Sequence, residues 1–506
     1  MYTMKCRNHV RRGRWAAFAA LILGIIVLLA GFAWLKMAPQ RRVSQTVVEA
    51  SCTEPGYVMT YDPASGTNTV ENLPALGHSF GAWAAEDGTG MQKRACTRCG
   101  VEEKARISSV PDDLLPELRL TGSLDGIGKK VKVPLKAKFS GMGEDFECYA
   151  IMTLQGHSTY GHPKRNYTVR FYEDDQSVVK HKLQFNTWNR EHKYILKANY
   201  IDVSQCRNLI GTRIWSSMAA CRNGLPARIA ALPTYGAVDG FPVDVYLNGE
   251  YFGLYMMNLH KDDDLYQMKE GERAALVICN QQTTDEALFR DKAAFLPDYS
   301  SDWEIEFCGT ADETWAQDSF NQLIDFVMNS PDDQFSSQLS DYLDVDAAVD
   351  YLLFIYALGL QHSGAKDLVM LNYGDVWIPS AYDMDEAFGL NANDAAYLAP
   401  DEFIPVQTDG VWSSGTGSLL WDRLLNAYFE EICSRYAFLR RDVLSQEKVI
   451  AMVEEFVGGI PEMRYDMDMN RYPDRPVQDM DMKTQITDYI VQRFDVLDAI
   501  LGGNGK

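Results

Sequence analysis

A run of 21 uncharged residues near the N-terminus most constrains what this chain can form. Residues 15–35 read WAAFAALILGIIVLLAGFAWL and carry no charged side chain. A helix of this length spans about 30 Å of hydrocarbon. Trp15 and Trp34 stand near its ends, where indole rings favour the membrane interface. The segment therefore predicts one transmembrane helix, with the rest of the chain folded outside the bilayer.

The charges on either side of this run predict its orientation. Residues 1–14 hold five Lys and Arg residues and no acid, whereas three basic residues (Lys36, Arg41 and Arg42) follow the run. This bias makes residues 1–14 a cytoplasmic basic segment and places the main domain outside the cytoplasm. A cleaved signal peptide is the alternative, but its apolar core is usually about 7–15 residues long. We expect an uncleaved signal-anchor in the cell membrane.

The composition after the apolar run is that of an acidic globular protein. The whole chain has a formal net charge of −22, with 46% hydrophobic and 23% charged residues. These fractions are ordinary for a protein with a large core. A strongly negative domain repels nucleic acid and anionic lipid, so we expect no nucleic-acid partner.

Residues 36–51 are predicted as a linker and residues 52–104 as a small cysteine-containing module. Cys96-Thr97-Arg98-Cys99-Gly100 forms a CxxCG motif, whose turn points two thiolates at one metal ion. Cys52 and His78 would complete a tetrahedral Cys3His structural Zn²⁺ site, and the stretch resembles short modules of bacterial surface proteins. A disulfide or free thiols remain the alternatives. Six further cysteines without regular spacing are interpreted as buried free thiols: Cys148, Cys206, Cys221, Cys279, Cys308 and Cys433.

Residues 115–500 are predicted as the main domain, with an α+β fold. Short alternating apolar runs over 117–172 predict strands, and residues 205–222 have helical spacing. Residues 240–258 predict a hairpin that turns at Asn248-Gly249. After about residue 315 two helices are expected, the second capped by Asp344, and then a short strand pair. The tail, about 417–500, is again helical, which gives a strand-rich first lobe and a helix-rich second lobe.

The segment from His362 to Gly389 carries the residues best suited to chemistry. Asp383 and Asp385 follow an apolar strand at positions i and i+2, so we expect both carboxylates on one side. Such a pair suits a hard divalent cation, which in turn bridges phosphates. Taken alone, an Asp-x-Asp in a turn is usually a solvated cap.

Five blocks of sequence, in order, resemble the CotH kinase family, the atypical protein kinases similar to spore coat protein H. The most specific is YDMDEAFGLN (382–391), where an aromatic residue precedes Asp-x-Asp and Phe-Gly follows. The others are QGHSTYGHPKRNYTVRF (155–171), YILKANYIDVSQCRN (194–208), DVYLNGEYFGLYMMNLHKD (244–262) and the Leu-Trp and Arg-Tyr pairs within 418–440. Together they cover about residues 115–475.

This resemblance implies an atypical protein-kinase-like bilobal fold, preceded by the transmembrane helix and the cysteine module. It implies phosphate transfer from ATP, with Mg²⁺ or Mn²⁺, to surface or secreted proteins. The implied metal ligands are Asp367, Asp383 and Asp385, and the implied nucleotide-binding residues are Lys164, Arg165, Arg207 and Lys261. The alternative for Arg207 is that it forms a buried structural pair with Asn208. The alternative for Lys164 is that its side chain is simply exposed to solvent.

The chain departs from the family pattern in the loop before the strand pair. His362 stands where the family has its candidate catalytic Asp, Asp367 where it has Asn, and Gln155 where it has Arg. Asp367 still suits Mg²⁺, and an imidazole can accept a proton. We therefore predict His362, Asp367 and Asp385 as catalytic residues. The competing hypotheses are a catalytically degenerate surface scaffold and, more weakly, a carbohydrate-associated cell-wall protein.

Overall fold

The computed structural model describes residues 44–62, 67–73, 75–76, 78–79, 84–86, 91–106, 115–156, 158–296, 301–391, 396–476 and 482–502. The chain divides into two compact units, Met1–Leu76 and Gly77–Lys506. The predicted cytoplasmic segment 1–14 and transmembrane helix 15–35 lie outside the described residues. Within the ranges given above, no helix combines the length and apolar character that a membrane span requires.

The first unit contains a three-stranded antiparallel sheet in the order β1-β2-β3. Its strands are β1 (Ser44–Val48), β2 (Gly56–Asp62) and β3 (Thr67–Leu73). The prediction that 36–51 is a linker is therefore wrong for Ser44–Val48. Those residues read SQTVV, and β-branched side chains favour the extended backbone that pairs with β2.

The second unit begins with another three-stranded sheet. It is formed by β4 (Ala84–Glu86), β5 (Met91–Ala95) and β6 (Glu102–Arg106), joined in the order β4-β5-β6. The CxxCG motif forms the tight turn between β5 and β6.

A closed seven-stranded barrel follows, with the strand order β10-β11-β13-β12-β7-β8-β9. The strands predicted over 117–172 and the hairpin that turns at Asn248-Gly249 are confirmed. The barrel strands are β7 (Glu117–Thr121), β8 (Val133–Ser140), β9 (Phe146–Gln155), β10 (Asn166–Tyr172), β11 (Lys193–Lys197), β12 (Gly240–Leu247) and β13 (Glu250–Leu259). Asn248 and Gly249 both have positive φ (52° and 87°), as a two-residue hairpin turn of type I′ requires.

The side chains of the barrel strands alternate between the interior and the outside. In β8, every second side chain from Val133 to Phe139 is buried and the residues between are exposed. The inward side chains fill the interior, where the rings of Phe185 and Phe241 lie 5.0 Å apart. Closure itself was not predicted, because it depends on a parallel pairing of β7 with β12 between strands far apart in the sequence.

A second, four-stranded sheet in the order β15-β14-β16-β17 lies outside the barrel. The predicted strand pair is confirmed as β16 (Val369–Asn372) and β17 (Trp377–Ser380); β14 (Ala275–Cys279) and β15 (Trp303–Cys308) complete the sheet. Two short antiparallel pairs are β18 (Leu390–Asn391) with β19 (Ala396–Tyr397), and β20 (Val406–Thr408) with β21 (Val411–Ser413).

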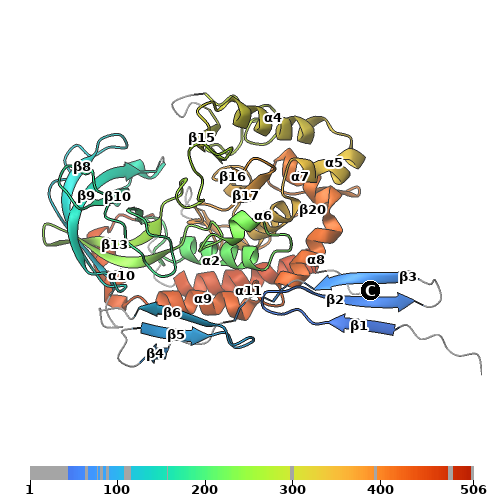
Figure 1. Ribbon diagram of the computed structural model, residues 1–506, viewed down its shortest axis with the longest axis horizontal. Helices are drawn as coiled ribbons and strands as arrows, with labels where there is room; N and C mark the ends of the chain where they lie inside the picture. The colour runs from blue at the N-terminus through green and yellow to red at the C-terminus, as the bar shows by residue number, and fades with distance from the viewer. Residues whose placement is uncertain are drawn as a thin grey trace, which may run out of the picture. The chain divides into compact units, whose positions relative to one another are not determined.

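The helices predicted in the second half of the chain are confirmed. They are α4 (Thr314–Asn329), α5 (Asp332–Gln338), α6 (Val345–Leu358), α7 (Leu419–Ala427), α8 (Phe429–Leu439), α9 (Gln446–Gly458), α10 (Glu462–Arg471) and α11 (Met482–Leu501). Helix α6 packs against β17 of the four-stranded sheet. Between β11 and β12 lie α2 (Arg207–Ala220) and α3 (Ala227–Ala230). Single 3₁₀ turns are η1 (Ser158–Gly161), η2 (Leu339–Asp341) and η3 (His362–Gly364). Figure 1 shows the barrel at one end of this unit and α4, α5 and α7 at the other, with α2 between them.

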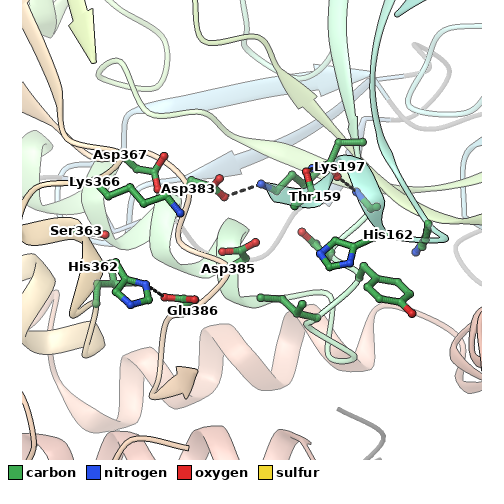
Figure 2. Close-up of a pocket in the computed structure, with 17 residues that line it drawn as sticks. Thr159, His162, Lys197, His362, Ser363, Lys366, Asp367, Asp383, Asp385 and Glu386 are labelled. Atoms are coloured by element: carbon green, nitrogen blue, oxygen red, sulfur yellow. Dashed lines mark hydrogen bonds and ion pairs between the residues drawn. The ribbon is translucent and has the colours of Figure 1, made fainter. Parts of the chain in front are cut away.

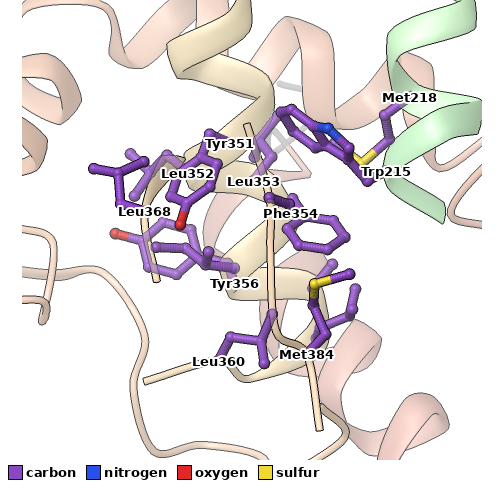
Figure 3. Packing of buried hydrophobic residues seen from close by; sticks show 14 of the residues in the cluster. Trp215, Met218, Tyr351, Leu352, Leu353, Phe354, Tyr356, Leu360, Leu368 and Met384 are labelled. Atoms are coloured by element: carbon purple, nitrogen blue, oxygen red, sulfur yellow. The ribbon is translucent and has the colours of Figure 1, made fainter. Parts of the chain in front are cut away.

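Helix α6 is the centre of the main core. Every residue from Ala347 to Leu358 is buried, so other parts of the protein cover the helix on all sides, with Arg222 and Arg435 paired to its Asp350. Asp344 caps its first turn, as predicted, by accepting a hydrogen bond of 2.8 Å from the Ala347 N–H. Gly359, with φ of 68°, ends the helix in the left-handed conformation. Figure 3 shows α6 packed against Trp215 and Met218 of α2.

The second unit is thus a mixed α/β structure in which strands dominate the first part and helices the rest. Its six cysteines outside the CxxCG motif are free thiols, as predicted, although Cys308 and Cys433 are only half-buried.

Candidate functional site

One cavity in the second unit brings together residues from the barrel and from the helical region (Figure 2). Its charged and hydroxyl-bearing lining includes Thr159, His162, Lys164, Lys197, His362, Ser363, Lys366, Asp367, Asp383, Asp385 and Glu386. The cavity has a volume of about 90 Å³, below the about 300–1,000 Å³ usual for small-molecule sites. It has room for an ion with water or phosphate oxygens, and a larger ligand would extend beyond it.

Hydrogen bonds from two core side chains to backbone carbonyls hold the 362–367 loop in place. The Tyr351 hydroxyl donates to the Ser363 carbonyl (2.8 Å), and the Trp421 indole N–H donates to the Gly364 carbonyl (2.7 Å). Asp367 adopts a left-handed backbone with φ of 64°, which is uncommon outside glycine. Strain of this kind persists only where surrounding contacts impose it, and it concentrates at functional sites.

The two carboxylates of the Asp-x-Asp motif reach the cavity in a way that the sequence did not predict. Strand β17 ends at Ser380, and Asp383 has φ of 55°, so the alternation expected of an extended strand does not apply here. Instead, Met384 is buried between them. Its N–H donates to the Asn208 side-chain oxygen (2.9 Å), and its side chain packs beside Gly211.

Gly211 is required by this packing. A Cβ built at Gly211 would lie 2.9 Å from the Met384 Cβ and 3.1 Å from Leu358. Glycine on α2 therefore lets the motif approach the helix, and Met384 serves as the anchor that aims Asp383 and Asp385 outward.

Arg207 lies behind the motif and does not line the cavity. Its side chain is fully buried and donates to the carbonyls of Ala387 (2.5 Å) and Phe388 (3.3 Å). Its Nε also donates to Asp202 (3.2 Å). The structure thus departs from the predicted nucleotide contact, because the guanidinium satisfies backbone carbonyls that would otherwise be buried unpaired. This arrangement fits the structural alternative for Arg207 and Asn208.

Two lysines that sequence analysis did not select stand among the carboxylates. Lys197, at the end of β11, donates to Asp383 Oδ1 at 2.6 Å. Burial disfavours its charge, but Asp383 and Asp385 outweigh burial and raise the pKa of Lys197. The pKa of Lys366 is raised likewise, against burial, by Asp367 and Asp383. The sequence did hold a signal for Lys197, because this lysine directly precedes the Ala-Asn pair of YILKAN (194–199), which belongs to one of the blocks that resemble the CotH family.

The carboxylates of the cavity repel one another. Burial and then the charge of Asp383 raise the pKa of Asp367 to about 7 and that of Asp385 well above its usual value. Burial also acts against ionisation of Asp383, but the ion pair with Lys197 outweighs it and lowers the pKa of Asp383. One carboxylate therefore holds the negative charge while two others tend to hold protons.

His362 has a carboxylate partner that sequence analysis also missed. Its Nδ1 lies within hydrogen-bond distance of Glu386 Oε2, and each side chain keeps 19% of its surface exposed. Glu386 directly follows Asp385, so the partner is part of the same motif. Holding one ring nitrogen fixes the ring and leaves Nε2 as the atom that can face a ligand.

The other predicted nucleotide contacts lie elsewhere or are already engaged. Lys164 borders the cavity, but its side chain is buried and its ammonium binds the Leu254 carbonyl (2.5 Å) and Asp468 (2.9 Å). Lys261 forms an ion pair with Glu306 and lies over the Tyr382 ring at 4.9 Å. Arg165 lies 5.8 Å from the Tyr160 ring centre. Neither Lys261 nor Arg165 lines the cavity.

The three predicted ligands of a divalent cation line the same cavity: Asp367, Asp383 and Asp385. Their carboxylates suit Mg²⁺ or Mn²⁺ chemically. In the described part of the chain, however, the oxygens of these three carboxylates do not all lie within 4.8 Å of one another. The ligand atoms of a separate cysteine–histidine cluster do. Lys197 and Lys366 lie among the carboxylates, as Figure 2 shows.

The cysteine–histidine cluster includes three of the four predicted zinc ligands, His78, Cys96 and Cys99. The Cys99 Sγ lies 3.2 Å from His78 Nδ1. Cys52, the fourth predicted ligand, belongs to the other compact unit, and its role stays a prediction.

Comparison with known proteins accounts for most of the second unit. The sequence model of the family described as CotH kinase protein matches residues 152–497, which include both loops of the cavity. No curated protein matches the chain. Because the matched region covers more than half of the 506 residues, the chain belongs to the CotH kinase family.

Proposed function

We propose that this chain is a membrane-anchored protein kinase whose main domain works outside the cytoplasm. It would transfer the γ-phosphate of ATP to a Ser or Thr hydroxyl of a surface or secreted protein. The observation that carries the proposal is the convergence of His362, Asp367 and Asp385 on one cavity in a CotH family chain. The apolar run 15–35 supports the anchor.

A divalent cation would be held by Asp367, Asp383 and Asp385. When bound, Mg²⁺ or Mn²⁺ supplies the positive charge that neutralises and orients the phosphates in transfer. The chain's donors fit this role, because the repulsion that raises the pKa values of Asp367 and Asp385 is what a divalent cation relieves. Lys197 and Lys366 would add charge next to the phosphate oxygens.

His362 would act as the general base in place of the family's aspartate. Its Nε2 takes the proton of the acceptor hydroxyl as the hydroxyl oxygen forms a bond to the γ-phosphorus. The bond from that phosphorus to the β–γ bridging oxygen breaks, and ADP leaves with the electron pair. Glu386 accepts a hydrogen bond from Nδ1–H of the neutral ring and stabilises the imidazolium that forms.

The barrel and the helical region would correspond to the two lobes of an atypical kinase fold. The cavity lining supports this assignment, since Lys197 comes from the barrel and Asp367 from the helical region. A nucleotide larger than the cavity of about 90 Å³ would extend between the two regions.

A catalytically degenerate scaffold or binding protein is the second candidate. Two observations favour it, the presence of His362 where the family has aspartate and the small volume of the cavity. Such a protein would keep the fold and bind ATP or a partner without transferring phosphate.

Transfer of radiolabel from [γ-³²P]ATP by the purified full-length chain with Mg²⁺ or Mn²⁺ tests the proposal. Asp385→Ala is expected to lower transfer by about 10²–10³-fold, the usual effect of removing one electrostatic stabiliser. Asp375→Ala, in the exposed β16–β17 turn, is the matched control and should leave transfer unchanged. Label that does not depend on Asp385 contradicts the proposed site.

Binding and transfer separate the two candidates. Thermal stabilisation by ATP without label, together with a gain of transfer in His362→Asp, would establish the degenerate protein. Transfer by the natural chain that falls in His362→Ala would establish the kinase.

A further inference from the structure

A second cluster of ligating side chains lies outside the kinase site, on the turn between β5 and β6. The ligand atoms of His78, Cys96 and Cys99 all lie within 4.8 Å of one another. Thiolate sulfur and imidazole nitrogen are the donors that Zn²⁺ prefers, and they differ in kind from the carboxylates of the cavity.

The turn that carries the two cysteines is built from its own sequence. The Gly100 N–H donates to the Cys96 carbonyl (2.8 Å), and the Cys96 N–H donates to the Val101 carbonyl (2.8 Å). Gly100 has φ of 77°, where a side chain is disfavoured. These contacts curl residues 96–100 so that both sulfurs approach the same point.

Backbone contacts bring the histidine to this turn. The Thr97 N–H donates to the Ser79 carbonyl (2.7 Å), and the Ser79 N–H donates to Cys96 Sγ (3.3 Å). An N–H directed at a ligating sulfur orients it and stabilises its negative charge. Because Ser79 follows His78, the same contacts hold the imidazole next to the cysteines.

The one donor–donor distance that the structure gives is slightly shorter than in a tetrahedral zinc site. Bonds of about 2.3 Å to sulfur and about 2.0–2.1 Å to nitrogen place two such ligands about 3.6 Å apart. The observed distance from Cys99 Sγ to His78 Nδ1 is 3.2 Å. Cys99 is a free thiol, so it is not consumed by the disulfide that the sequence left open.

The surroundings of the cluster show why a metal would be needed. Within 78–106, Cys96 is the side chain classed as buried among those that the structure describes, with 3% of its surface exposed. A small module in which few of the described side chains are buried usually depends on a metal, a disulfide or a partner for its stability.

We propose that His78, Cys96 and Cys99 bind a structural zinc ion that holds the β5–β6 turn. The inference is independent of kinase activity, because none of the three residues lines the catalytic cavity. Cys52 is the fourth ligand predicted from the sequence, and the same experiment tests it.

The test is the metal content of the purified full-length chain under reducing conditions, measured by mass spectrometry. We expect one zinc ion per chain and a sulfur shell at about 2.3 Å in X-ray absorption at the zinc edge. Cys96→Ser and Cys99→Ser should lose the zinc. Cys433→Ser, a half-buried free thiol on α8, is the matched control and should retain it.

The outcomes divide clearly. A natural chain without zinc, iron in its place, or equal zinc in Cys96→Ser would overturn the proposal. If a variant misfolds, the natural chain loaded with Co²⁺ still tests the proposal. It should show the visible absorption of tetrahedral thiolate-bound cobalt. Loss of zinc in Cys52→Ser would establish the fourth ligand, and unchanged zinc there would overturn the Cys3His assignment.

Discussion

The carboxylate cavity and the cysteine–histidine turn both gather ligating side chains, but opposite means hold them. The cavity is assembled from distant segments: its loops are bonded to the core through Tyr351, Trp421 and Asn208, and Met384 is buried beneath its carboxylates. The turn owes its shape to hydrogen bonds within 79–101, and of the side chains in 93–102 Cys96 is the one that is buried.

This difference indicates what a bound metal ion would do at each of the two sites. In the cavity, lysines already balance part of the carboxylate charge, so the geometry exists before any cation binds and the cation would serve chemistry. In the turn, the ligands lie on a short loop that its own backbone hydrogen bonds shape, so the metal would serve folding. Four measurements test this contrast, from the largest expected effect to the smallest.

Removal of zinc should separate the two regions most strongly. Binding of structural zinc is worth about 10–16 kcal/mol in small modules, so chelation should remove most protection from β5 and β6. Helix α6 should keep its protection, because apolar side chains bury it. Hydrogen–deuterium exchange of the full-length chain with and without chelator measures both. Equal loss of protection in α6, or no change in 91–106, would contradict the contrast.

Loss of the imidazole should be the largest chemical effect in the cavity. His362→Ala is expected to lower phosphoryl transfer by about 10²–10⁴-fold, the usual contribution of a general base. Glu386→Gln should lower it less, because the ring remains but loses its charged partner. The measurement is kcat for label transfer.

A second histidine–carboxylate pair provides the control for this experiment. His181 pairs with Glu173 on the barrel, outside the cavity. His181→Ala should therefore leave transfer unchanged. A similar loss in both variants would mean that the effect is structural and not catalytic.

Removal of the anchor beneath the carboxylates should cost stability as well as activity. Met384 is 2% exposed, and Met384→Ala should lower the free energy of unfolding by about 2–5 kcal/mol through the cavity that it leaves. Met463→Ala, at a methionine that is 58% exposed, should change it by less than about 0.5 kcal/mol. Denaturant titration checks both, and equal stability of the two variants would refute an anchoring role.

The smallest effect is the pH dependence of metal binding in the cavity. Burial and Asp383 raise the pKa of Asp367 to about 7, so a proton occupies this ligand at lower pH. A cation has to displace that proton and the proton that the raised pKa of Asp385 retains, so Mg²⁺ affinity should fall by at least about tenfold for each pH unit below 7. Calorimetry from pH 5.5 to 8.5 measures this slope. Asp367→Asn keeps an oxygen ligand without titrating, and an unchanged slope in that variant would exclude Asp367 as the cause.

Local patterns predicted most elements of the second unit and the segments that line its cavity. The strands of 117–172, the Asn248-Gly249 hairpin, the Asp344 cap and the later helices are all present. Each depends on side-chain period, turn residues or capping within a few positions, which a sequence displays directly.

The charge partners could not be predicted in the same way. Lys197 meets Asp383 across 186 residues, and Lys164 meets Asp468 across 304. The first pair makes Lys197 a site residue that the sequence had not marked. The second engages the lysine that had been expected to contact phosphate. The first pair exists because the Asp-x-Asp loop packs against the barrel, and the second because α10 packs against β13.

The sequence by itself therefore determined the short motifs, Asp-x-Asp and CxxCG, because two to four residues are enough to set their spacing. Tertiary structure alone decided which lysine neutralises which carboxylate, which arginine is buried, and that His362 has Glu386 as its partner. The reason is physical, since ion pairing and pKa depend on distance and on exclusion of water. Neither quantity has a value until the chain has packed.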